Sequence, residues 1–195
     1  ILLIAIYFIV NYIITNRQAT HPIVHFHTLF SKKPFVGATM AISSHLTLLT
    51  GIAGINVYIV RILKLPFDIS LHFYFFFFVG VIITGILKMF FYSSVGAGFL
   101  GTLGSSALLY VSIHWIILGN TINIPLLYIQ GLLLGFGASM TLVSGSMATL
   151  LDGDLKEAAQ RSQTMHTIRN FSAAMLIPII AYTIKNHIQK GTQSI

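Results

Sequence analysis

The stretch IPLLYIQGLLLGFGASMTLVSGSMATLL, from Ile124 to Leu151, contains no Asp, Glu, Lys or Arg. As an α-helix it is long enough to cross the roughly 30 Å hydrocarbon core of a bilayer. The whole chain of 195 residues shares this character, because 55% of its residues are hydrophobic and only 8% are charged. In water-soluble domains about a quarter of the residues carry a charge. The composition therefore predicts a polytopic α-helical membrane protein.

Apolar segments of similar length follow one another along the chain, separated by polar connections. We predict a single all-α transmembrane domain over residues 1–195, a bundle of about six helices at approximately 1–14, 35–60, 69–87, 95–118, 124–151 and 165–184. The run Phe75–Phe78 favours a strand by propensity, but an isolated strand would leave its backbone groups unpaired in hydrocarbon, so we expect a helix there. Because the first segment begins at Ile1 with no basic region before it, we interpret the chain as starting within a helix.

The charged residues are few and unbalanced, with 11 Lys and Arg against 4 Asp and Glu. The basic residues are scattered and form no face with interleaved aromatic side chains, which argues against a nucleic-acid partner. Alternating crossings place more of them at one face of the membrane, and the positive-inside rule therefore predicts that the connections at 16–34, 88–94 and 152–164 lie in the cytoplasm. The absence of Cys excludes disulfides, thiol catalysis and Cys-ligated metals.

Glycines recur at helical spacing within the segments predicted at 95–118 and 124–151. In lipid, close helix packing depends on such small residues, because no hydrophobic effect drives the helices together. A glycine-rich phosphate loop would instead connect a strand to a helix, and the sequence predicts no such unit. We therefore predict helix packing at Gly101, Gly131, Gly135 and Gly137.

Three of the four acidic residues lie in the short segment Asp152-Gly-Asp-Leu-Lys-Glu157. Gly153 suits the end of one helix, while Asp154 and Glu157 have the spacing of a capping box at the start of the next. Three neighbouring carboxylates could also hold Mg²⁺ or Ca²⁺. Since capping accounts for two of the carboxylates and Lys156 lies among them, we predict a structural connection and no metal site.

Polar residues inside the apolar segments are candidate functional residues. An ionisable or strongly polar side chain at bilayer depth is costly without a partner, so it is a functional hypothesis by default. His45, Asn56 and Gln130 are therefore candidates for a substrate or proton pathway. The alternative for each is a hydrogen bond to a neighbouring helix, and for His45 the sequence favours this structural interpretation.

Arg169 lies about one turn into the last predicted helix. It is predicted to anchor that helix, by reaching the cytoplasmic surface or by pairing with the acidic segment before it. The alternative is a role in gating, and Asp152 and Asp154 belong to the same candidate group.

Three histidines, His21, His25 and His27, share one polar loop. They could bind a metal, but a loop lacks the rigid placement and supporting hydrogen bonds of zinc sites. Haem ligation needs paired histidines on intramembrane helices, and the sequence offers no such pair. We predict no metal and no cofactor.

Three stretches resemble a known transporter family. The loop HPIVHFHTLFSKKPF, from His21 to Phe35, is similar to a cytoplasmic loop of the form Pro-Leu-x-Asp-Leu-x-Leu-Phe followed by basic residues and Phe. LLGFGAS at 133–139 is similar to a Gly-x-Gly helix, and 158–174 is similar to a small-residue segment containing an Arg, here Arg169. In this order they resemble the C-terminal half of a major facilitator superfamily transporter, of the fourteen-helix drug:proton antiporter branch.

The resemblance implies part of a major facilitator fold and a secondary active transporter rather than an enzyme. It implies proton-coupled export of small amphipathic compounds across a bacterial inner (plasma) membrane, by a protein whose N-terminal half is missing from this chain. Such transporters bind substrate near the midplane between two halves that rock to alternate access. The expected partners are thus the lipid bilayer, a small-molecule substrate, protons and that N-terminal half. One alternative is transport of a siderophore, sugar or metabolite. Another is a membrane enzyme or respiratory-chain subunit, in which His45 would serve protons or a cofactor.

Overall fold

The computed structural model describes residues 2–19, 26–117, 123–151 and 154–193, and within these ranges the chain is helical and contains no strand. The helices are α1 (Leu2–Gln18), α2 (Lys32–Val57), α3 (Phe67–Ile117), α4 (Ile124–Leu151) and α5 (Ala158–Gln193). A π-helical turn, Tyr58–Ile62, extends α2, and short 3₁₀ turns lie at Phe26–Leu29 and Leu155–Glu157. The prediction of an all-α chain is confirmed for the described residues, including Phe75–Phe78 within α3.

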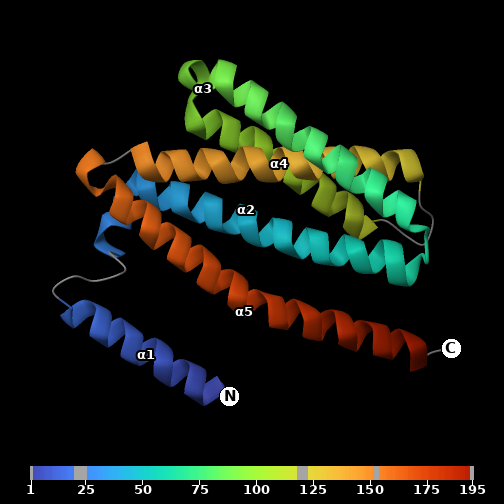
Figure 1. The fold of residues 1–195 in the computed structure, drawn as a ribbon, viewed down its shortest axis with the longest axis horizontal. Coiled ribbons are helices and arrows are strands. Elements are labelled where there is room, and N and C mark those ends of the chain that lie inside the picture. The colour runs from blue at the N-terminus through green and yellow to red at the C-terminus, as the bar shows by residue number, and fades with distance from the viewer. Residues whose placement is uncertain (1, 20–25, 118–122, 152–153, 194–195) are drawn as a thin grey trace.

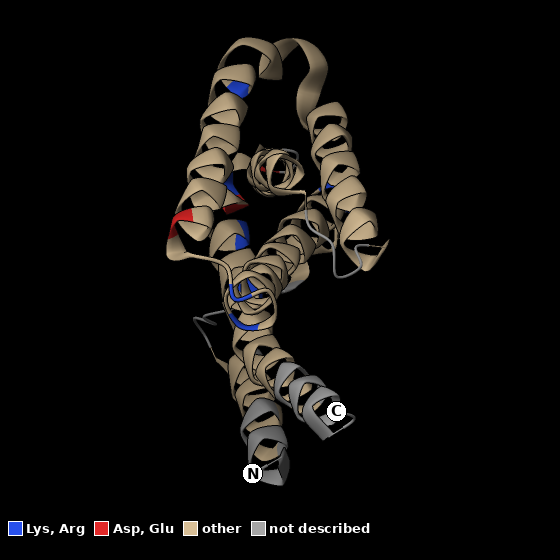
Figure 2. Ribbon diagram, turned by 90° about the vertical axis from the view of Figure 1, so that its right-hand side faces the viewer, with Lys and Arg blue, Asp and Glu red and all other residues tan. Residues whose placement is uncertain are grey.

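Three of these helices are long and apolar enough to cross a membrane, and they cover Lys32–Ile62, Phe67–Ile117 and Ile124–Leu151. Most of each helix carries neither basic nor acidic side chains (Figure 2). The predicted crossings at 1–14 and 165–184 are not among them. The described part of α1 spans 17 residues, and the first turns of α5 are rich in Gln, Ser, Thr, His and Arg.

Helix α3 is a hairpin of two antiparallel arms, residues 67–95 and 97–117 (Figure 1). A continuous helix of 51 residues would be about 77 Å long, far more than one bilayer thickness. The chain reverses at Gly96, whose backbone angles are φ 75° and ψ 168°. This region of backbone conformation is accessible essentially only to glycine. The five helices thus form six helical segments in the predicted order.

The turn of this hairpin does not lie where the sequence predicted it. The stretch 88–94 was expected to be a connection, but it is helical and forms the last turns of the first arm. Lys88 is half-buried there, and its Nζ donates a hydrogen bond to the Met140 carbonyl of α4 at 2.8 Å. Lys88 therefore connects α3 to α4, because its long side chain reaches a backbone carbonyl of α4.

Replacing Gly96 with alanine is expected to strain the turn and lower the free energy of unfolding by about 1–3 kcal/mol. A Cβ at Gly96 would meet no atom within 4 Å, so the cost arises from the backbone angles alone. Gly98 also has open space around it but no positive φ, so Gly98→Ala is the matched control. Unfolding in mixed detergent micelles measures both variants, and equal stabilities would contradict the proposed strain.

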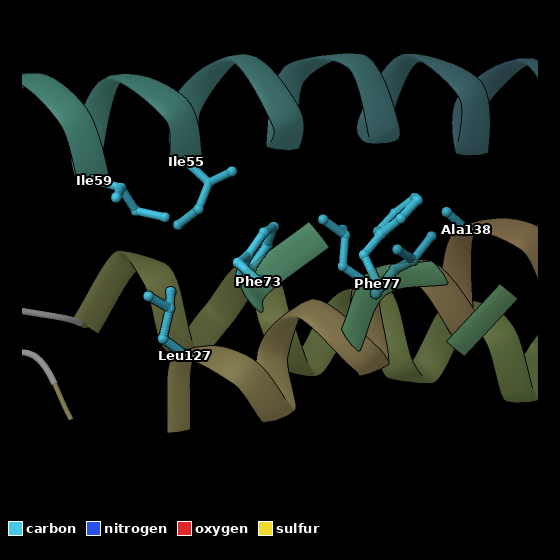
Figure 3. Packing of buried hydrophobic residues seen from close by; sticks show 8 residues of the cluster. Ile55, Ile59, Phe73, Phe77, Leu127 and Ala138 are labelled. Atoms are coloured by element: carbon cyan, nitrogen blue, oxygen red, sulfur yellow. The ribbon is translucent and has the colours of Figure 1, made fainter. Parts of the chain in front are cut away.

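Helix α4 is the centre of the bundle, because it packs against α2, α5 and both arms of α3. The main apolar core lies where α2, α3 and α4 meet (Figure 3). There Ile55 of α2 and Ile59 of the π-helical turn face Phe73 of α3 and Leu127 of α4, and all four side chains are buried. This core fixes the positions of both arms of α3 relative to α2.

Glycines allow the first arm of α3 to approach α4 closely. A Cβ added to Gly131 would lie 2.8 Å from the carbonyl oxygen of Phe73. A Cβ on Gly135 would overlap the Phe77 carbonyl, and one on Gly80 would overlap the Leu132 carbonyl. At these crossings backbone lies against backbone, so no larger residue fits without moving a helix.

Two other faces of α4 use glycine in the same way. On the second arm of α3, a Cβ on Gly137 would lie 2.8 Å from the Gly104 carbonyl. On α2, a Cβ on Gly145 would lie 2.6 Å from the Gly37 carbonyl. Gly101 instead faces the flexible side chain of Met40, 2.7 Å from a Cβ built there. The two arms of α3 and helix α2 therefore each contact a different face of α4 at close range.

Helix α5 runs in the same direction as α2, lies against it near its start and diverges from it towards the C-terminus (Figure 1). Buried Met165 packs against Ala38 and Ala41 of α2, and Ile168 covers this small cluster. Figure 1 shows α1 apart from the other helices.

Candidate functional site

Three adjoining cavities lie between α2 and the second arm of α3, next to α4. We call these three cavities together the seam groove. The first, of about 270 Å³, is lined by Ser43, Ser44, Thr47, Ser105, Ser112 and Thr141, with Leu108 and Leu109. The second, of about 470 Å³, shares Thr47 and Ser112 with the first and adds Thr50, Gly51 and Trp115 among others. The third, of about 220 Å³, is lined by Gly54, Ile55, Tyr58 and Trp115. Neighbouring cavities share lining residues, so the three lie next to one another along the two helices.

One stripe of each helix lines the seam groove. On α2 the lining positions step through 44, 47, 51, 54 and 58, and on the second arm of α3 through 105, 108, 112 and 115. These steps of three and four residues keep to one helix face. The groove therefore runs from about the middle of α2 to the π-helical turn that follows it, at Tyr58. Sequence reasoning missed this site, because the small hydroxyl residues that line it give no distinct signal within a single helix.

Hydroxyl groups give the groove its polarity. Ser44 Oγ donates to the Ala138 carbonyl at 3.0 Å, and Thr141 Oγ1 donates to the Gly137 carbonyl at 2.8 Å. A hydroxyl that donates to the backbone keeps lone pairs that can accept a hydrogen bond from a ligand. None of the residues lining the three cavities is charged. The groove therefore suits a neutral polar group with an apolar part.

Gln130 lies behind the groove rather than in it. Its side chain is fully buried, its Oε1 accepts from Trp115 Nε1 at 2.7 Å, and its Nε2 lies 2.9 Å from His114 Nδ1. The indole can only donate, so the amide oxygen must face Trp115 and the amide NH₂ must face His114. His114 Nδ1 is consequently an acceptor. Gln130 was predicted as a pathway residue; the structure places it in a hydrogen-bonded chain that ends at Trp115, which lines the groove.

Asn56 joins α2 to the first arm of α3. Its Oδ1 accepts a hydrogen bond from the Tyr74 hydroxyl at 2.7 Å, and both residues are half-buried. Asn56 lines none of the three cavities. The structure therefore does not bring Asn56, Gln130 and His45 together, and each of the three faces a different helix contact.

His45 and Arg169 meet where α2 and α5 pack together. Both side chains are half-buried, and the charge of Arg169 interacts with the imidazoles of His45 and His166. Arg169 Nε is buried and has no hydrogen-bond partner. The described carboxylates do not pair with Arg169: Glu157 pairs with Arg161, Asp154 caps a turn, and Asp68 lies at the start of α3.

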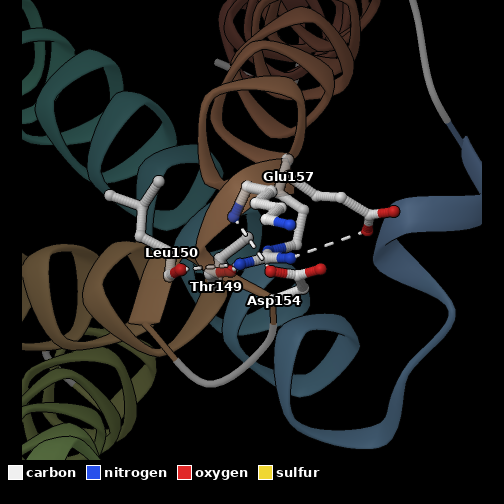
Figure 4. Close-up of polar contacts among 6 residues, drawn as sticks. Thr149, Leu150, Asp154 and Glu157 are labelled. Carbon is white, nitrogen blue, oxygen red and sulfur yellow. Dashed lines mark hydrogen bonds and ion pairs between the residues drawn. The ribbon is translucent and has the colours of Figure 1, made fainter.

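The acidic connection acts partly as predicted. Asp154 Oδ1 accepts a hydrogen bond from the Lys156 backbone N at 3.0 Å, which caps the 3₁₀ turn that leads into α5. Glu157 does not complete a capping box; its carboxylate lies 3.8 Å from Arg161 Nη1 instead (Figure 4). Asp152 and Gly153 lie outside the described residues.

Arg161 is the residue of this region that sequence reasoning missed. Its side chain is only 1% exposed. Nε donates to the Thr149 carbonyl at 2.9 Å and Nη2 donates to the Leu150 carbonyl at 2.8 Å (Figure 4). These carbonyls belong to the last turn of α4, where intrahelical donors are lacking and the helix dipole favours a cation. The arginine therefore holds the start of α5 to the end of α4.

The predicted histidine loop is only partly within the described residues. His27 lies exposed in the 3₁₀ turn Phe26–Leu29, whereas His21 and His25 fall outside the described ranges. In the part of the chain that the structure describes, no group of three or more His, Asp and Glu side chains could hold a metal ion.

No protein-family model, curated protein or solved structure matches the chain. The resemblance to major facilitator transporters therefore remains a prediction from the sequence.

Proposed function

We propose that this chain forms part of a secondary active transporter that carries a small amphipathic compound through the membrane. The supporting observation is the seam groove, a hydroxyl-lined cavity among helices that are otherwise apolar. Binding sites for small molecules combine apolar walls with a few placed polar groups. In the seam groove, Leu108 and Trp115 supply apolar contacts and Ser112 and Thr47 supply hydrogen-bonding groups.

The course of the groove supports a transport path rather than a closed pocket. It begins near the middle of α2 and reaches the π-helical turn at Tyr58, close to the end of the membrane-spanning helix at Ile62. The positive-inside prediction assigns that end to the non-cytoplasmic side. In this proposal the groove is the outward half of an alternating-access pathway, and a second half of the transporter, which the family resemblance implies, would cover its open side.

We propose that transport is coupled to protons through two consecutive hydrogen bonds, from His114 to Gln130 and from Gln130 to Trp115. A proton arriving on His114 Nδ1 would turn that atom from an acceptor into a donor. Two donors cannot share a hydrogen bond, so the Gln130 amide would have to rotate or lose its bond. Rotation would turn the amide NH₂ towards the Trp115 indole, break the bond between Trp115 Nε1 and Gln130 Oε1, and free the indole to move within the groove. Protonation would thereby alter substrate binding.

The alternative substrate is a neutral polyhydroxylated metabolite such as a sugar. The uncharged hydroxyl lining favours it, because each lining hydroxyl can exchange hydrogen bonds with a ligand hydroxyl. Competition between an amphipathic dye and a simple sugar for uptake into vesicles separates the two cargoes.

The experiment that tests transport uses the full-length protein in proteoliposomes with an imposed proton gradient. Movement of an amphipathic dye that stops when the gradient is collapsed is the expected result. Movement that ignores the gradient would contradict proton coupling, and no movement of either dye or sugar would contradict the transport proposal.

Replacing Ser112 with phenylalanine is expected to fill the groove and reduce transport by about tenfold or more, since a misfitting group in a pocket costs at least 1–3 kcal/mol of binding. Ser112 lines the two larger cavities, so its side chain cannot grow without entering them. Ser106→Phe on the same arm is the matched control, because Ser106 is exposed and lines none of the three cavities. Equal transport by the two variants would remove the groove from the pathway.

A further inference from the structure

Three basic side chains gather between α2 and α5, outside the seam groove: Arg169, His166 and His45, which together we call the basic cluster. His166 and Arg169 are three residues apart on α5 and therefore share a face. His45 lies one turn beyond Ala41 on α2, and Arg169 lies one turn beyond Met165 on α5. Because Ala41 and Met165 belong to one packed cluster and the two helices run in the same direction, the next turn brings His45 and Arg169 to the same level.

The basic cluster has no counter-ion among the described residues. Arg169 Nε is buried without a hydrogen-bond partner. The carboxylates that the structure describes are engaged or distant, since Glu157 pairs with Arg161 and Asp68 begins α3 at the other end of the bundle. A guanidinium that is partly removed from water is disfavoured when no anion balances its charge. The described residues therefore leave the positive charge of the basic cluster unbalanced.

The surroundings define the chemical class of that anion. The three basic side chains are each half-buried, so a ligand can reach them. Arg169 lies 11 positions after Ala158, about 16 Å along the helix. Two turns later on the same side of α5 lie two apolar side chains, half-buried Leu176 and exposed Ile177. An oxyanion that carries an apolar tail matches the basic side chains and the apolar side chains beside them. The guanidinium fork binds carboxylate and phosphate with two hydrogen bonds, and the tail would contact the apolar side chains.

We propose that the basic cluster binds the carboxylate or phosphate group of an amphipathic anion. The anion balances the charge of the cluster, and its tail lies along the apolar side chains of α5. This site is separate from the seam groove and does not depend on transport.

The test uses the full-length protein in neutral maltoside micelles, titrated with sodium decanoate or with phosphatidylglycerol. Side-chain nitrogen resonances of the histidines report the site, and His45 and His166 are expected to shift while His72 does not. Decanol, which has the same tail but no charge, is the ligand control. Tighter binding of decanoate identifies a free amphiphile as the ligand, and tighter binding of phosphatidylglycerol identifies a lipid headgroup. Equal shifts with decanol, or no shift with either anion, would overturn the proposal.

Arg169→Gln is expected to weaken anion binding about tenfold or more, because it removes a charge-assisted pair of hydrogen bonds. Arg61→Gln makes the same chemical change at an exposed position at the end of α2 and should leave binding unchanged. Should Arg169→Gln fail to fold, His166→Gln tests the same site and is expected to weaken binding severalfold. Unchanged affinity in whichever of these variants folds would contradict the site.

Discussion

Gly135→Ala is expected to lower the free energy of unfolding by about 3 kcal/mol, the upper part of the usual range for an overpacked core. A Cβ at this position would overlap the carbonyl of Phe77 on the first arm of α3. The obstacle is backbone rather than a flexible side chain, so no rotamer change can relieve it. The first arm and α4 would have to separate. Loss of that contact would also disturb Phe73, which packs in the same core.

Gly85→Ala on the first arm of α3 is the control for this variant. A Cβ there meets nothing within 4 Å, and alanine is a better helix former than glycine. Gly85→Ala is therefore expected to leave stability unchanged or to raise it slightly. Detergent unfolding followed by circular dichroism compares the two, and a Gly135→Ala protein as stable as Gly85→Ala would show that the helices tolerate separation.

The helices could be predicted from the sequence because apolar runs of bilayer length leave few alternatives. Their ends could not be placed as well. Helix α3 continues through Lys88, since that side chain finds an acceptor on α4 that no local pattern reveals. The reversal at Gly96 was equally hidden. Gly96, Gly98 and Gly101 look alike in sequence, and only the backbone angles distinguish the first from the others.

The candidate site shows the same limit. Asn56 and Gln130 were chosen as polar residues in apolar segments, and both are engaged in interhelical hydrogen bonds. The groove is lined instead by small hydroxyl residues such as Thr47 and Ser112, whose presence in a membrane helix is unremarkable one at a time. Which face of a helix points into a cavity depends on its neighbours, and a single segment does not contain that information.

Arg161→Gln is expected to lower the free energy of unfolding by about 2–4 kcal/mol, because two charge-assisted hydrogen bonds are lost from a buried site. The carbonyls of Thr149 and Leu150 would be left without their donors in the last turn of α4. A glutamine is shorter and presents a single NH₂ group, so it cannot reach both. The start of α5 would then detach from the end of α4 before the rest of the bundle unfolds. Protease cleavage between α4 and α5 should accordingly increase together with the loss of stability.

Two control variants separate the buried hydrogen bonds of Arg161 from its charge. Glu157 is 42% exposed and its contact with Arg161 is 3.8 Å, so Glu157→Gln should cost no more than about 1 kcal/mol. Arg161→Lys keeps the positive charge but lacks the planar fork that contacts two carbonyls at once. If the hydrogen bonds dominate, Arg161→Lys should be nearly as destabilised as Arg161→Gln. If the lysine variant is as stable as the unsubstituted protein, the helix dipole and the charge suffice, and the two-carbonyl contact is not what holds α5 to α4.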